Sequence, residues 1–147
     1  MKGVERMTAK EYLRQYITAK NRFKSISDEM IEIRSAATRI TPVISDMPSG
    51  SYVNDKIALS VERLDECSKK LEEEAKRMQK AMDDVQNVIN SVSNPTYRQV
   101  LTYRYINGYT WEQIAVVMNY SYVHICRLHG YALKVAKDVI ECYIETC

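Results

Sequence analysis

The sequence predicts an all-α protein, in which a long antiparallel helical hairpin, paired as a coiled coil, is followed by a helix-turn-helix module. Turn-forming residues are scarce, because 4 glycines and 3 prolines make up about 5% of the 147 residues, against an average of roughly 12%. This scarcity excludes a β-sandwich or barrel. Two stretches repeat apolar residues at coiled-coil spacing, and shorter stretches with helix-capping signals follow Pro95.

The first predicted helix begins at a capping box, in which Thr8 and Glu11 stand at the spacing that lets each side chain accept the other residue's backbone N–H. The helix is expected to end at Ile40, because Pro42 forces the residue before it out of the helical region. Between these limits, small or apolar residues recur at alternating steps of four and three: Tyr12, Tyr16, Ala19, Phe23, Ile26, Met30, Ile33, Ala37 and Ile40.

A connection is predicted over about 41–55, because this stretch contains Pro42, Pro48 and Gly50. A second seam follows at the same spacing: Ile57, Val61, Leu64, Ser68, Leu71, Ala75, Met78, Met82, Val85, Ile89 and Val92. Two helices of similar length, joined by a connection that can reverse direction, predict a hairpin over residues 1–94. The pattern permits pairing within one chain or between chains, and therefore also a homodimer through this helical arm.

The predicted boundary between the arm, 1–94, and a second module, 95–147, lies at Asn94 and Pro95. Asparagine is a favourable N-cap, and proline is favoured at the first helical position. Within the second module, further helix limits are indicated by Asn107-Gly108, by the capping box Thr110-Trp111-Glu112-Gln113 and by Ser121, whose helix is expected to run to about Glu145.

The spacing of three residues in this module is typical of a DNA-binding helix-turn-helix. Such a motif needs a small residue where its two helices cross, a turn residue that tolerates positive φ four positions later, and an aliphatic anchor six positions beyond. Ala115, Asn119 and Ile125 meet these needs, since asparagine enters the left-handed region more readily than most residues. The alternative is a helical hairpin that packs only on its neighbours.

The segment RYINGYTWEQIAVVMNYSYVHICRLHGYAL resembles the fourth conserved region of bacterial primary sigma factors. The whole chain, with AKEYLRQYITAKNRFKSI near its start and TPVISDMPSG in the connection, resembles sigma-region-4-like phage and prophage regulators related to the ArpU and RinA late-gene activators. The resemblance is most specific over roughly 95–137. It implies double-stranded DNA as a partner, and transcriptional activation with host RNA polymerase.

The resemblance also implies roles for individual residues. It places Arg104 and the start of the helix after Thr110 on backbone phosphates, and it places His124 near the backbone. Helical geometry indicates independently that Tyr122, Val123, Cys126 and Arg127 face outward if Ile125, Leu128 and Ala132 face the core. The candidate DNA-binding residues are Arg104, Thr110, Trp111, Ser121, Tyr122, Val123, His124, Cys126, Arg127 and Lys134.

The sequence departs from the sigma pattern on the outward face. Sigma factors carry arginine, glutamate and arginine where this chain has Tyr122, Val123 and Cys126. Arg127 can make a bidentate contact to guanine, and Val123 can meet a thymine methyl group. A standard promoter element is therefore not the expected target. Trp111, at the first turn of a helix, is expected to pack across the module more often than to stack on a ligand.

Charge and composition narrow the function classes further. Residues 95–137 carry five basic side chains against one acidic, a local net charge of +4 that is compatible with an anionic partner. Four cysteines without a C-x-x-C pair indicate reduced intracellular thiols and no structural metal. No enzyme motif occurs, so neither catalytic residues nor a cofactor are expected. Without a long apolar stretch or a secretory signal, we expect a cytoplasmic protein that does not span a membrane.

The expected function is a sequence-specific DNA-binding regulator that activates phage or prophage genes together with RNA polymerase. An activator is favoured over a substitute sigma factor, because the sigma regions that melt DNA are missing. The alternative is a small terminase subunit for DNA packaging, since such proteins also combine a helix-turn-helix with long helices that assemble a ring. A purely structural coiled-coil adaptor, without affinity for DNA, is the third interpretation.

Overall fold

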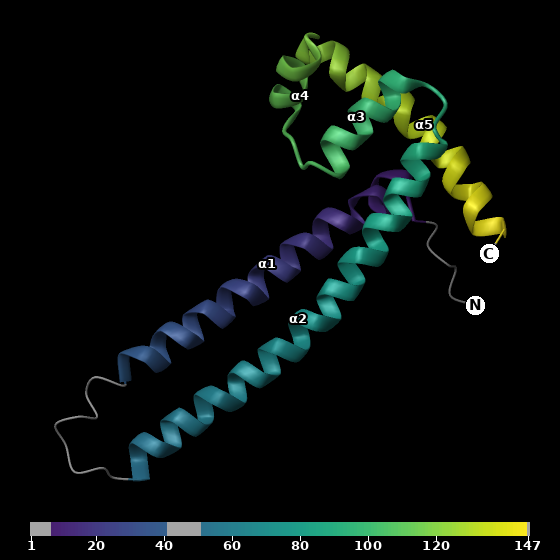
Figure 1. The fold of residues 1–147 in the computed structure, drawn as a ribbon. Helices are drawn as coiled ribbons and strands as arrows, with labels where there is room; N and C mark the ends of the chain where they lie inside the picture. The colour runs from purple at the N-terminus through teal and green to yellow at the C-terminus, as the bar shows by residue number, and fades with distance from the viewer. Residues whose placement is uncertain (1–6, 41–50, 147) are drawn as a thin grey trace. The chain divides into compact units, whose positions relative to one another are not determined.

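The computed structural model describes residues 7–40 and 51–146, which contain five helices and no strand (Figure 1). The helices are α1 (Ala9–Ile40), α2 (Ser51–Ser91), α3 (Pro95–Tyr105), α4 (Trp111–Met118) and α5 (Tyr122–Thr146). The predicted all-α architecture, a long helical hairpin followed by a helix-turn-helix, is confirmed. Within the described segments, no helix has both the length and the apolar character that a membrane crossing requires.

The helix starts follow the capping signals in the sequence. At α1, the Thr8 backbone N–H donates to the Glu11 carboxylate at 2.7 Å, and the Glu11 N–H donates to the Thr8 hydroxyl at 3.3 Å. At α3, the Asn94 side chain accepts from the N–H of Thr96 at 2.9 Å, and Pro95 is the first helical residue. These local hydrogen bonds satisfy N–H groups that have no partner within the helix.

The predicted connection over 41–55 is too long at its C-terminal end. Helix α2 already begins at Ser51, so residues 51–55 are helical, and the remaining residues, 41–50, lie outside the described part of the chain. The physical reason lies in composition. After Gly50, neither glycine nor proline occurs before Pro95, so no residue in this stretch strongly opposes extension of the helix to Ser51.

The described residues form two compact units that divide both long helices. One unit combines the chain up to Thr18 with the segment from Gln79 onward, and the other runs from Ala19 to Met78. The sequence placed a boundary at residues 94 and 95 instead. The difference arises because the first turns of α1 and the last turns of α2 bury side chains in one core with α3 and α5. As a limit between independently folding segments, the boundary at 94 and 95 stays a prediction.

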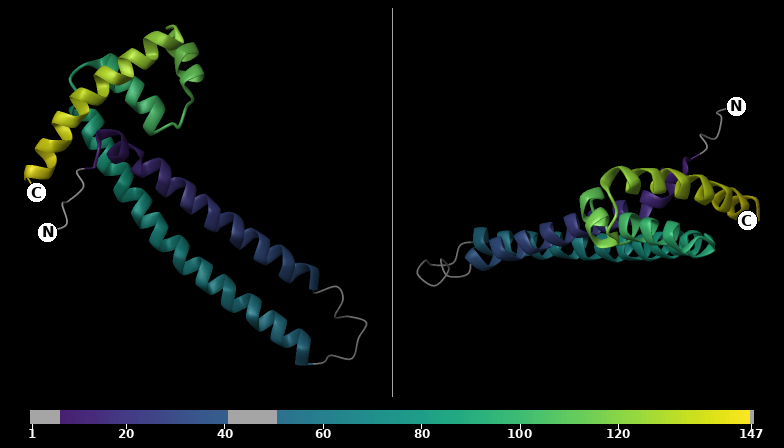
Figure 2. Two further views of the ribbon diagram at one scale, coloured as in Figure 1. Left: turned by 180° about the vertical axis from the view of Figure 1, so that it is seen from behind. Right: turned by 90° about the horizontal axis from the view of Figure 1, so that it is seen from above.

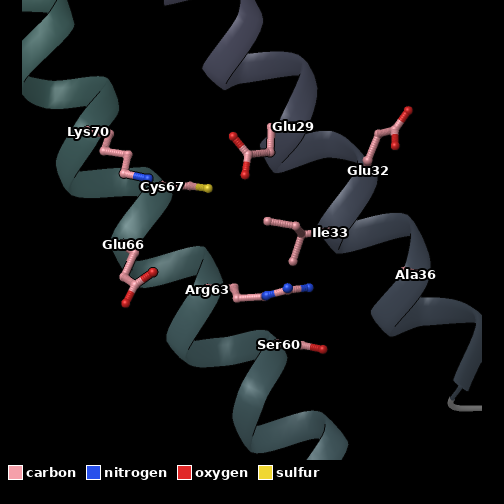
Figure 3. A pocket seen from close by; sticks show the side chains of 9 residues that line it. All are labelled: Glu29, Glu32, Ile33, Ala36, Ser60, Arg63, Glu66, Cys67 and Lys70. Carbon is pink, nitrogen blue, oxygen red and sulfur yellow. The ribbon is translucent and has the colours of Figure 1, made fainter.

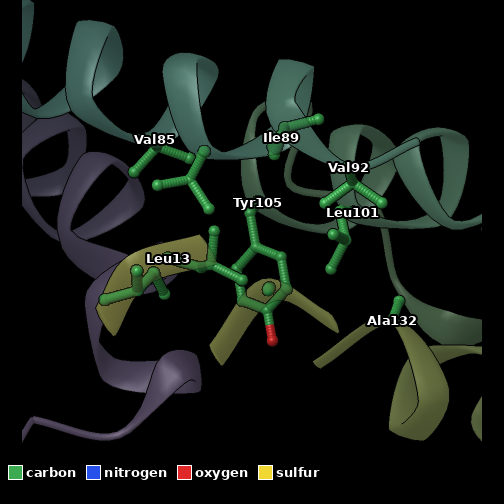
Figure 4. Close-up of a cluster of buried hydrophobic side chains, with 10 residues drawn as sticks. Leu13, Val85, Ile89, Val92, Leu101, Tyr105 and Ala132 are labelled. Carbon is green, nitrogen blue, oxygen red and sulfur yellow. The ribbon is translucent and has the colours of Figure 1, made fainter. Parts of the chain in front are cut away.

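The core of the first unit joins side chains from four helices that are far apart in the sequence (Figure 4). Leu13 of α1 is fully buried there beside the aromatic ring of Tyr105 from α3. The buried members are Leu13, Val85, Val88, Ile89, Val92, Leu101, Tyr105, Ala132, Ala136 and Ile140. The α3–α5 region therefore depends for its core on the beginning of α1 as well as on the end of α2.

In the second unit, α1 and α2 lie side by side and run antiparallel (Figures 1 and 2). The face by which α2 packs here differs from the predicted seam. Cys67 and Glu74, which are not seam members, are buried, whereas the seam residues Val61 and Ser68 are exposed. The face of α2 that packs on α1 thus lies roughly 50° around the helix axis from the predicted seam. Apolar spacing did not decide which of these two faces of α2 packs on α1, because Leu64 and Leu71 lie on the border between them and belong to both.

Candidate nucleic-acid interface

A small core holds the three helices of the helix-turn-helix module together. Its buried members are Val100 from α3, Ile114 and Ala115 from α4, and Ile125 from α5. Ala115 lies in this core together with Ile125, as the spacing predicted for the small crossing residue and the aliphatic anchor. Tyr103, Tyr109, Trp111, Met118 and Leu128 pack around these residues. The small crossing residue and the aliphatic anchor of the predicted motif are therefore both core residues.

The turn between α4 and α5 has the geometry that the motif requires. Asn119 ends α4 in the left-handed region, with φ 56° and ψ 43°. The N–H of Tyr120 donates to the carbonyl of Ala115 at 3.0 Å, and the N–H of Asn119 donates to that of Val116 at 3.2 Å. These two bonds form a Schellman motif, which terminates the helix and turns the chain sharply. The prediction that asparagine replaces the usual glycine is confirmed.

The helix α5 begins as predicted and presents one face of its first two turns to solvent. The hydroxyl of Ser121 accepts from the N–H of His124 at 3.2 Å, which caps the helix. All four residues predicted to face outward are exposed: Tyr122, Val123, Cys126 and Arg127. His124 is also exposed, and its ring packs edge-on against Tyr120 with 4.8 Å between ring centroids. The contact of these residues with DNA stays a prediction.

Two neighbours on this surface interact with each other. Cys126 lies one helical turn after Tyr122, and its negatively charged form, more than burial, raises the pKa of the Tyr122 phenol. As a phenol, Tyr122 can donate a hydrogen bond as well as accept one. An exposed phenol, an exposed thiol and the Val123 side chain make this surface less basic than the corresponding surface of a sigma factor.

Arg104 has contacts within the module that the sequence did not reveal. One terminal N–H group of its guanidinium donates to the carbonyl oxygen of Tyr109 at 2.9 Å, and the guanidinium carbon lies 4.3 Å from the Trp111 ring centroid. Arg104 therefore ties the end of α3 to the start of α4. Its predicted phosphate contact stays a prediction, but a substitution at Arg104 will also disturb the fold. Trp111 packs across the module, as the sequence indicated.

The start of α4 and the later part of α5 complete the candidate surface. Thr110 and Gln113 form the predicted capping box, with bonds of 3.2 and 2.9 Å, and Thr110 itself is exposed. On α5, Gly130 and Lys134 follow Arg127 along the exposed side. A Cβ at Gly130 would meet no side chain beyond its chain neighbours and no other helix within 4 Å, so packing within the described residues does not require a glycine there. The Nζ atom of Lys134 lies 5.9 Å from the centroid of the Tyr131 ring.

The sequence did not predict the role of His129, a buried residue of α5 that contacts α3 and α4. Its Nε2 lies 2.8 Å from the Tyr105 hydroxyl, and its ring centroid lies 4.4 Å from that of Trp111. Burial, together with repulsion from Lys10, Arg104 and Arg14, lowers the pKa of His129 to about 4. His129 stands four residues after Ile125 and three before Ala132, so the core spacing of α5 was the signal that could have identified it.

We expect the stability of the module to fall as the pH drops from about 6.5 toward 4. An unfolded histidine takes up a proton below about pH 6.5, whereas folded His129 does so only near pH 4. Acid thus favours the unfolded chain, by about 2 kcal/mol once the pH reaches the lower value. The part of the stability that depends on a neutral His129 is fully present above about pH 6.5. Urea unfolding followed by Trp111 fluorescence at several pH values measures this effect.

Two single substitutions separate His129 from other acid-sensitive groups. His129→Gln retains a hydrogen-bonding side chain but does not titrate, so we expect it to flatten the stability profile between pH 6.5 and 5. His124→Gln removes the other histidine of the chain, which is exposed, and should leave the profile unchanged. Equal profiles for wild type and His129→Gln would contradict the assignment.

Residues 94–135 match the protein family described as Sigma-70, region 4. The matched segment contains α3, α4 and the first half of α5, and it includes the capped start of α5 together with its exposed residues. This part of the chain is therefore a sigma-region-4-like helix-turn-helix, a DNA-binding module. No curated protein and no solved structure matches the chain.

Proposed function

We propose that this protein is a sequence-specific DNA-binding regulator, which activates transcription of phage or prophage genes together with host RNA polymerase in the cytoplasm. The observation that carries the proposal is the sigma-region-4-like segment, whose α5 starts with a capped turn that exposes Tyr122, Val123 and His124. Such a helix start is the part of a helix-turn-helix that enters the major groove. The proposed role is binding, not enzymatic catalysis.

The charge of the same segment supports DNA as the partner. Between residues 95 and 137, Glu112 is the single acidic side chain, against five basic ones. Lys134 and Lys137 are exposed on α5, where they can attract a phosphate backbone. Specific contacts fall to the helix start, where Arg127 is the candidate for guanine and Val123 the candidate for a thymine methyl group. The region therefore combines general and sequence-dependent binding groups.

Mapping the sites that the full-length protein occupies on host and prophage DNA tests the proposal. We expect a small set of related sequences upstream of prophage genes, and increased transcription by host polymerase from those promoters when the protein is added. Binding that does not discriminate between sequences, or bound promoters whose output does not rise, would contradict it. A ring of about eight or nine copies that binds DNA would favour the packaging function of a small terminase subunit instead.

A further inference from the structure

The two edges of the hairpin in the second unit differ in chemistry. On one edge, a groove of about 510 Å³ between α1 and α2 is lined by charged side chains (Figure 3). We call this the pocket edge, and the charged residues that line it are Glu29, Glu32, Arg63, Glu66 and Lys70. Ile33 and Cys67 lie at the bottom of the groove, where the two helices face each other. Charged side chains thus predominate along this groove.

The opposite edge carries exposed apolar side chains. Ile31 follows Glu29 by two residues and Val61 precedes Arg63 by two, which is about 200° around an α-helix. Both side chains therefore point away from the pocket edge, and their exposed fractions are 58% and 60%. We call this the open edge. It consists of Lys20, Lys24, Ile31 and Arg34 on α1, and of Val61, Asp65, Ser68 and Glu72 on α2.

The open edge coincides with the seam that the sequence repeats but the hairpin leaves exposed. Val61 and Ser68 belong to the regular 4-3 pattern of α2, whereas the hairpin buries Cys67 and Glu74 on the other flank of Leu64 and Leu71. Helix α2 thus carries two overlapping seams that share one central row. One seam packs on α1, and the other is free to pack on a further helix.

Charge complementarity favours α1 of a second copy as that helix. The α1 side of the open edge is basic, through Lys20, Lys24 and Arg34. Its α2 side carries the acidic Asp65 and Glu72, and the Asp65 carboxylate also lies 3.1 Å from Lys69 on its own helix in an exposed pair. A two-fold axis parallel to the hairpin places α1 of each copy across from α2 of the other, so unlike charges meet. A two-fold axis across the hairpin would set like charges opposite each other.

The levels of the charges along the hairpin agree with this arrangement. Ile33 and Arg63 line the same groove, and the two helices run antiparallel. Lys24 lies nine residues before Ile33, and Glu72 lies nine residues after Arg63. Because the helices are antiparallel, both steps lead in the same direction along the hairpin, so Lys24 and Glu72 lie at about the same height along its axis. The Glu72 carboxylate is 3.5 Å from Lys76 on its own helix, but both side chains are more than 70% exposed. That pair is weak and leaves Glu72 able to bind a second cation.

We propose that the protein is a two-fold dimer in which the open edges of two hairpins pack face to face, with Val61 in the apolar centre and Lys24 of each copy paired with Glu72 of the other. The resulting four-helix bundle covers the second seam of α2. Each dimer carries two DNA-binding modules, which suits a target with two half-sites. The dimer does not depend on DNA binding, so it can be tested separately.

Sedimentation equilibrium of the full-length chain tests the surface. We expect a dimer, and we expect Val61→Glu to raise its dissociation constant by about tenfold or more, because a charge becomes buried at the interface. Leu59→Glu is the matched control, since Leu59 is 55% exposed on the same helix but lies on the pocket edge. It should leave the dissociation constant unchanged. Circular dichroism verifies that both variants retain their helices.

A charge exchange tests the pairing itself. Lys24→Glu and Glu72→Lys should each weaken the homodimer, and the double variant should restore it. A mixture of the two single variants should form heterodimers that are tighter than either homodimer, because every 24–72 contact then joins unlike charges. The proposal is overturned by a monomer at about 100 μM, by a ring of higher order, by equal effects of Val61→Glu and Leu59→Glu, or by no gain in the mixture.

Discussion

Leu13→Ala is expected to destabilise the helix-turn-helix module by about 2–5 kcal/mol, although the substitution lies far from that module in the sequence. The side chain of Leu13 is fully buried in the cluster that includes Leu101 and Tyr105 of α3 and Ala132 of α5. Truncation to alanine therefore leaves a cavity at the point where α1 joins the core of the module. Chemical unfolding followed by Trp111 fluorescence measures the loss, since Trp111 is the single tryptophan.

Leu59→Ala provides the matched control for this experiment. It makes the same chemical change on α2 at a position that is 55% exposed, so we expect a loss below about 0.5 kcal/mol. A loss below about 1 kcal/mol for Leu13→Ala would show that the module folds without the start of α1. The boundary that the sequence places at residues 94 and 95 would then describe the folding units better than the shared core does.

The helices could be predicted from the sequence because their limits are set locally. Thr8, Asn94, Thr110 and Ser121 each cap the helix that follows, through bonds to groups two or three residues away. Asn119 adopts the left-handed conformation for an equally local reason. Such signals act over a few residues and are visible in the order of the side chains. The last helix, which is capped by Ser121, is expected from the sequence to run to about Glu145, and it runs to Thr146.

Features that depend on the packing of distant segments could not be predicted in the same way. Spacing alone did not decide which flank of α2 faces α1, because Leu64 and Leu71 serve both alignments. The bond between Tyr105 and His129 joins residues 24 positions apart. The resemblance to sigma factors places Arg104 on phosphates, but it does not reveal that the hydrogen bond of Arg104 to Tyr109 and its stacking on Trp111 hold two helices together. Tertiary contacts of this kind leave little trace in local periodicity.

Arg127→Ala is expected to remove most of the preference of the protein for its selected DNA site over a scrambled one. Arg127 is exposed on the outward side of α5, one turn after Val123 and within two turns of the Ser121 cap. Its guanidinium is the one cationic group among the four outward-facing candidates, so it alone can bind a guanine edge in bidentate fashion. The lost contact corresponds to about 1–3 kcal/mol of discrimination, or roughly 5- to 150-fold.

Lys134→Ala is the control, because Lys134 lies on the same side of α5, seven residues beyond Arg127, and is also exposed. We expect it to weaken binding to the selected and the scrambled duplex by the same factor, and to lower the slope of log affinity against log salt by about one. Titrations of both variants against both duplexes at several salt concentrations separate the two roles. If Arg127→Ala weakens both duplexes equally, Arg127 contacts phosphate, and the sequence preference must come from the phenol, valine and thiol of the α5 start.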